Sequence, residues 1–141
     1  MDAPAQSSAA RPPFSRGSII VGALLGFLAV ALGAFGAHGL EGRLGPDRLA
    51  WFETGVDYHL AHALALILTG FVSGDRPPHR AVRIAGWAFA VGVIVFSGSL
   101  YALALTGITG LGMITPFGGV AFLIGWAALM WGVAREDRAG R

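Results

Sequence analysis

The feature that most constrains this chain is an uncharged stretch from Ile84 to Ala134, which runs for 51 positions without Asp, Glu, Lys or Arg. A helix needs roughly 20 apolar residues to cross the hydrocarbon core of a membrane, so this stretch can make two crossings. Glycines and threonines interrupt it at 106–112, and Pro116 suits the first turn of a new helix. We therefore predict two membrane spans here, over 84–105 and 115–134.

Two more apolar segments precede this stretch. Residues 17–37 carry no charge, which predicts a span over 18–37. The segment 56–73 contains polar residues near one end and is otherwise apolar, so we predict a further span there, led by a short helix that begins at Pro46. The chain is thus predicted to be an all-α membrane protein, a bundle of four transmembrane helices.

Composition agrees with a membrane protein and excludes several functional classes. Apolar residues make up 55% of the chain and charged residues only 13%, whereas soluble domains carry about 25% charged residues. The absence of cysteine excludes disulfides, thiolate metal sites and cysteine nucleophiles. A net charge of +2 gives no basic surface for nucleic acid.

The arginines predict the orientation of the bundle. Of the ten basic residues, all arginines, eight lie in the first tail, the 74–83 loop and the last tail, and two lie in the 38–55 loop. The positive-inside rule then places both termini in the cytoplasm, so we expect a multi-pass membrane protein. One membrane domain at 17–135 should lie between a disordered cytoplasmic tail at 1–16 and a short tail at 136–141.

Small residues recur at helical spacing along three of the spans. Helices associate in lipid by close backbone approach, so a repeated small residue marks a helix–helix interface. The alternating spacing of three and four residues keeps such a stripe on one face of a left-handed bundle. The predicted packing glycines are Gly22, Gly26, Gly33, Gly92, Gly118, Gly125 and Gly132.

Polar residues gather near the outer end of the second span. The same helical register places Tyr58 and His62 inside the bundle, with His59 beside them, and His38 follows the first span on that side. We expect these residues to form one layer together with Asp57 and Glu53. Three interpretations remain open: a hydrogen-bonded joint between helices, a metal site built on imidazoles, and a proton-linked or small-solute pathway.

Catalytic motifs are not expected. The segment 115–119 resembles a phosphate-binding glycine loop only superficially, because the chain has no lysine to complete it. Ser97-Gly98-Ser99 does not have the pattern of a nucleophile elbow. We expect no catalytic residue, bound metal or cofactor, and a non-enzymatic accessory role. Its expected partners are membrane lipids, a second copy of the chain or another membrane protein. A carrier or channel-like module is the alternative.

Four separated motifs resemble the YgdD-like family of small, uncharacterised inner-membrane proteins, a domain of unknown function with eukaryotic relatives. They are GAFGAHGL at 33–40, FETGVDYHLAHAL at 52–64, FSGSLY at 96–101, and ITPFGG at 114–119 with the later Gly125-Trp126. The resemblance covers about residues 18–134 and implies a four-span inner-membrane protein, with no catalytic residue or cofactor. Glutamine is common in that family where this chain has His59, which makes His59 the weakest candidate metal ligand.

Overall fold

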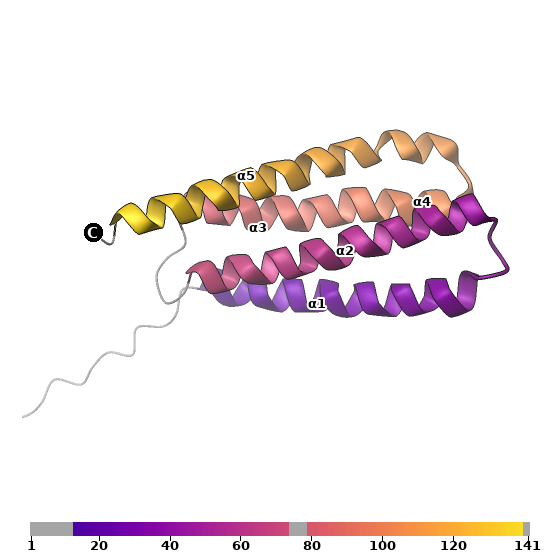
Figure 1. Cartoon of the computed structure of the whole chain (residues 1–141), viewed down its shortest axis with the longest axis horizontal. Coiled ribbons are helices and arrows are strands. Elements are labelled where there is room, and N and C mark those ends of the chain that lie inside the picture. Colours follow the sequence, from indigo (N-terminus) through magenta and orange to yellow (C-terminus); the bar gives the residue numbers. More distant parts are fainter. Residues whose placement is uncertain (1–12, 74–78, 140–141) are drawn as a thin grey trace, which may run out of the picture.

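The structure, a computed structural model, describes residues 13–73 and 79–139, and the regular elements in these two ranges are all helical. Figure 1 shows four long helical rods in the order α1, α2, α3 with α4, and α5 across the view. The Pro13 end of α1 and the Ala139 end of α5 lie at the same end of the bundle. The elements are α1 (Pro13–Phe35), the π-helical turn η1 (Gly36–Leu40), α2 (Pro46–Ser73), α3 (Arg80–Gly92), the π-helical turn η2 (Val93–Ser97), α4 (Gly98–Thr106), the 3-10 turn η3 (Thr109–Met113) and α5 (Thr115–Ala139).

Four of these rods are long and apolar enough to cross a membrane, which confirms the predicted four-span, all-α fold. Their spanning segments are Arg16–Leu40, Pro46–Val72, Arg80–Thr106 and Thr109–Arg135. The helix that begins at Pro46 runs into α2, as expected. Three boundaries differ from the prediction: α1 begins at Pro13 within the expected tail, α3 begins at Arg80, and α5 runs on to Ala139. Charge alone marked those boundaries, but a helix can extend beyond the membrane into polar sequence. The expected tail at 1–12 and loop at 74–78 lie outside the described residues.

Helices α1 and α2 form one antiparallel pair, closed by glycines of α1 and η1. A Cβ added at Gly22 would lie 2.6 Å from the side chain of Ile67, and one at Gly33 would lie 3.3 Å from Val56. Further along, a Cβ at Gly36 would lie 3.2 Å from the ring of Phe52. The absence of side chains at these positions lets the two backbones approach closely.

Helices α3 and α5 form the second pair, with a regular seven-residue register. Gly132 faces Val82, Gly125 faces Phe89, and Gly118 faces the backbone of Phe96. The contact positions therefore advance by seven residues along α3 and η2 while they go back by seven residues along α5. Gly92 adds the reverse arrangement, because the ring of Phe122 occupies the space beside it. Large side chains of one helix thus fill the gaps left by glycines of the other.

The predicted packing role of Gly26 requires correction. A Cβ built at Gly26 would meet nothing within 4 Å, so this glycine makes no close helix contact among the residues that the structure describes. The other six predicted packing glycines all lie against a neighbouring helix. Helix α1 has few neighbours to meet, since it packs mainly on α2. Only 17% of its most apolar window is buried, against 44% for α2.

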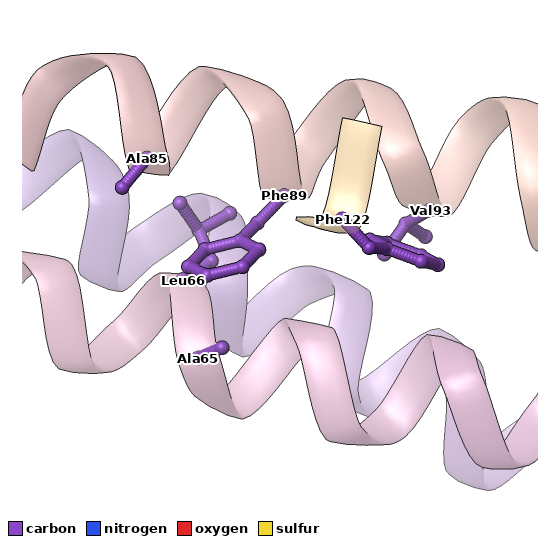
Figure 2. Packing of buried hydrophobic residues seen from close by; sticks show 6 residues of the cluster. All are labelled: Ala65, Leu66, Ala85, Phe89, Val93 and Phe122. Carbon is purple, nitrogen blue, oxygen red and sulfur yellow. The ribbon is translucent and has the colours of Figure 1, made fainter. Parts of the chain in front are cut away.

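The core lies where the two helix pairs meet. Ala65 and Leu66 of α2 pack against Phe89 of α3 and Phe122 of α5. Figure 2 shows these side chains in the space between the helices, together with Ala85 and Val93. Because α2 also contacts α1 and α4, it is the central helix of the molecule. Its polar residues therefore face several different neighbours.

Candidate functional site

His62 joins α2 to α5 through both nitrogens of its ring. Its Nδ1 lies 2.8 Å from the backbone carbonyl of Tyr58, one turn earlier in α2. The indole Nε1–H of Trp126 donates to Nε2 of His62 at 3.2 Å. A carbonyl can only accept and an indole N–H can only donate, so Nδ1 carries the proton and Nε2 the lone pair. The two bonds fix one tautomer of a neutral imidazole.

Aromatic rings from three helices pack against this imidazole. Phe122 of α5 stacks on it with ring centroids 3.5 Å apart and planes within 10°. Tyr58 stacks against the same imidazole from α2, and Phe89 of α3 lies against it at a tilt. His62 itself is buried, with 6% of its surface exposed. The site is therefore a packed junction of three helices with one polar group at its centre.

His59 is equally buried but faces a different helix. Its Nδ1 lies 3.1 Å from the hydroxyl of Tyr101 on α4. The ring of Tyr101 also covers Gly55, where a Cβ would lie 2.8 Å away. Within the described part of the chain, Nε2 of His59 and Oγ of Ser97 are buried without a hydrogen-bond partner. His59 is thus held through one nitrogen, whereas His62 is held through two.

The remaining polar residues do not join this junction, so the prediction of one layer is corrected. His38 is exposed in the turn η1, and in the described residues it makes no hydrogen bond or ring contact with His59 or His62. Asp57 and Glu53 line a small cavity of about 90 Å³ on the side of α2 that faces α1. His59 and His62 thus contact different helices, while Glu53 and Asp57 line a separate cavity beside α1.

The geometry also bears on the metal interpretation. Among the residues that the structure describes, no group of three His, Asp or Glu side chains is placed to hold a metal ion. A metal ligand needs a free nitrogen lone pair, and that of His62 is engaged by Trp126. The arrangement supports the first of the three interpretations, a hydrogen-bonded joint between helices.

The sequence did not predict that Tyr101 and Trp126 contact the histidines. The sequence marked Tyr101 and Trp126 only as parts of the family motifs. The indole N–H of Trp126 could have indicated its contact, because a tryptophan in the middle of an apolar span needs a hydrogen-bond acceptor. Such an acceptor must be a side chain or an open carbonyl on a neighbouring helix. His62 is the acceptor here.

Arg48 also holds the fold together, although the sequence marked it only as one of two arginines in the 38–55 loop. Its guanidinium donates from Nε to the carbonyl of Ala104 at 2.5 Å and from Nη2 to that of Leu105 at 2.6 Å. These carbonyls belong to the last turn of α4, which lacks partners within the helix. Gly107 ends that helix in the left-handed conformation, with φ of 74°. Arg48 therefore binds the start of α2 to the end of α4.

Known proteins are similar in sequence to this chain over most of its length. The profile of DUF423, a protein of unknown function, matches residues 32–119. The chain belongs to the DUF423 family. The UPF0382 membrane protein YwdK of Bacillus subtilis is 49% identical over 112 residues, which cover 79% of this chain and 91% of the relative. The UPF0382 inner membrane protein YgdD of Escherichia coli is 42% identical over 132 residues, which cover 89% of this chain and 95% of the relative. No solved structure matches the chain.

The DUF423 relatives agree with the fold. Their names place them in membranes, and that of the E. coli relative specifies the inner membrane. Together with four helices long and apolar enough to span a bilayer, this identifies a multi-pass protein of the bacterial inner membrane. The matched region contains His59, His62 and Tyr101 and ends before Trp126. The family confirms the resemblance found in the sequence motifs.

Proposed function

We propose that this DUF423 protein is a non-enzymatic accessory protein of the membrane, which acts by packing its lipid-facing helices against other membrane helices. The observation that carries this proposal is the closed junction around His62. Both ring nitrogens bond to the protein itself, and aromatic rings fill the space around them. The buried polar groups thus connect helices, which leaves the outer helix faces as the surfaces available to partners.

Helix α1 offers the most accessible of these faces. It packs mainly on α2, and its outward side chains include Leu24, Phe27 and Val30, all exposed. Gly26 lies on this helix with open space where a side chain would be. In lipid, helices associate most closely where a small residue lets the backbones meet, so Gly26 suits the approach of a second helix.

In-membrane photo-crosslinking tests the proposal. A photoreactive amino acid at Gly26 should give a protein adduct of one defined mass, whereas the same group at Arg43, in the loop beyond η1, should not. An adduct of twice the chain mass would identify a second copy as the partner, and another mass would identify a different protein. Labelling of lipid alone at Gly26 would contradict the proposal.

A flux measurement tests the carrier alternative against the same proposal. The wild-type chain in proteoliposomes should give no pH-dependent movement of protons or small solutes above empty vesicles. Flux that disappears in His62→Ala, while His59→Ala retains it, would overturn the accessory function. Both variants must first show wild-type helix content.

A further inference from the structure

A lipid-facing crevice lies where α1, α2 and α3 meet. It has a volume of about 250 Å³, and its lining is almost wholly apolar. Small residues create it, because Gly17 and Ser18 of α1 face Gly86 and Ala90 of α3, while Val21, Leu66 and Trp87 complete the lining. A buried apolar cavity of about 150 Å³ is enough to hold a benzene molecule. The crevice therefore has room for a segment of acyl chain.

The crevice is open to the membrane rather than enclosed. Trp87 is 64% exposed and Val21 is 44% exposed on its two sides. Both residues belong to the spanning segments of α1 and α3. A crevice of this kind is bathed by lipid tails, so its natural occupant is an acyl chain rather than a soluble metabolite.

Positive charge surrounds the end of this crevice. Arg16 directly precedes Gly17 on α1, and Arg80 and Arg83 occupy the first turn of α3, ahead of Gly86. Figure 1 shows that α1 and α3 begin at the same end of the bundle. Cα–Cβ bonds on a helix tilt toward its N-terminus, which for α1 and α3 is the end of the bundle where these arginines lie. The N-terminal ends of two helices add positive potential there.

Acidic residues lie at both ends of the bundle. Glu41, Asp47, Glu53 and Asp57 belong to the half opposite the crevice, whereas Glu136 and Asp137 belong to the last turn of α5, at the crevice end. The crevice end combines apolar lining, arginines and helix N-termini. Basic pockets between transmembrane helices are typical binding places for anionic lipid headgroups.

We infer that this crevice binds one anionic phospholipid, with an acyl chain along Val21, Gly86 and Ala90 and the headgroup phosphate at Arg16 and Arg80. This inference does not depend on the helix contacts proposed for α1, because the lipid site can be measured on the purified chain alone. It assigns phosphatidylglycerol, or another phospholipid with a net negative charge, as the ligand class.

Native mass spectrometry tests the inference. The full chain is released from nanodiscs that contain equal amounts of phosphatidylglycerol and phosphatidylcholine, and the retained lipid is identified by mass. A surface arginine changes the binding of an anionic lipid by about fivefold, so wild-type protein should retain phosphatidylglycerol with at least that preference. The paired variant Arg16→Gln with Arg80→Gln should lose the preference, and Arg43→Gln at the opposite end should keep it.

Filling the crevice provides the matched test of its apolar part. Val21→Phe enlarges a side chain that lines the crevice, whereas Ile20→Phe enlarges its neighbour, which is 67% exposed and does not line it. We expect Val21→Phe to abolish the retained lipid and Ile20→Phe to preserve it, with equal thermal unfolding of both. Equal lipid retention by these two variants, or equal retention of the two lipids by wild-type protein, would overturn the inference.

Discussion

The indole of Trp126 donates its Nε1–H to Nε2 of His62, and this bond of 3.2 Å connects the last helix of the bundle to the central one. Few backbone contacts join α2 and α5 directly, so the connection depends on long side chains. Nε2 of His62 can accept a hydrogen bond from the indole only while the imidazole proton is on Nδ1, which donates to the carbonyl of Tyr58. The helix pairing thus specifies the tautomer of a buried histidine.

A double-mutant cycle should reveal this bond as a coupling energy. Trp126→Phe should lower the free energy of unfolding by about 1 kcal/mol in the wild-type background, because it leaves Nε2 of His62 without its donor. In a His62→Leu background the same substitution should cost little, since no acceptor remains. Unfolding by sodium dodecyl sulfate in mixed micelles measures both costs. An equal cost in the two backgrounds would rule out the bond.

The space around two of the predicted packing glycines, Gly118 of α5 and Gly26 of α1, predicts opposite results for their substitution by alanine. Gly118→Ala places a Cβ against the backbone of Phe96, which cannot rotate away, so we expect a loss of about 2 kcal/mol. Gly26→Ala places its Cβ in open space and should be neutral or stabilise the helix by up to about 1 kcal/mol. Thermal unfolding in detergent compares the two. A stable Gly118→Ala protein would show that the helices lie further apart.

Arg48 should be more sensitive to substitution than Arg43, the other arginine between residues 38 and 55. Arg48→Ala removes two charge-assisted hydrogen bonds to the last turn of α4 and should destabilise the protein by about 1.5 kcal/mol. Arg48→Lys should recover only part of this loss, because an ammonium cannot reproduce the planar fork of a guanidinium. Arg43→Ala is the matched control and should have no effect. Hydrogen exchange at residues 103–107 would locate the change.

Metal ions should leave the junction unchanged. Both nitrogens of His62 are occupied by protein partners, and a metal would have to displace Trp126 to bind there. Addition of zinc or of a chelator should therefore shift the unfolding temperature of wild-type protein no more than that of His62→Leu. A zinc-dependent stabilisation confined to the wild type would restore the metal interpretation.

The sequence predicted the spans and most packing glycines because both follow from local patterns. A run without charge marks a span whatever surrounds it, and small residues at alternating spacing mark a face. His38, Asp57, His59 and His62 were expected to contact one another because they lie near one face of the second span. A helix face predicts which residues share neighbours only when all neighbouring helices pack on that one face. Helix α2 has neighbours on several sides, so residues about 60° apart are buried against different helices. The pairing of His62 with Trp126 spans 64 positions, and no local pattern encodes it.

The register of glycines has a consequence for how the chain enters the bilayer. The α1–α2 hairpin and the α3–α5 hairpin each close through their own glycines, so each can form a compact unit as soon as its two helices are inserted. Only the docking of one hairpin on the other then remains, through the aromatic rings around His62. Synthesis in this order lets the first half of the protein mature in the membrane before the second half leaves the ribosome.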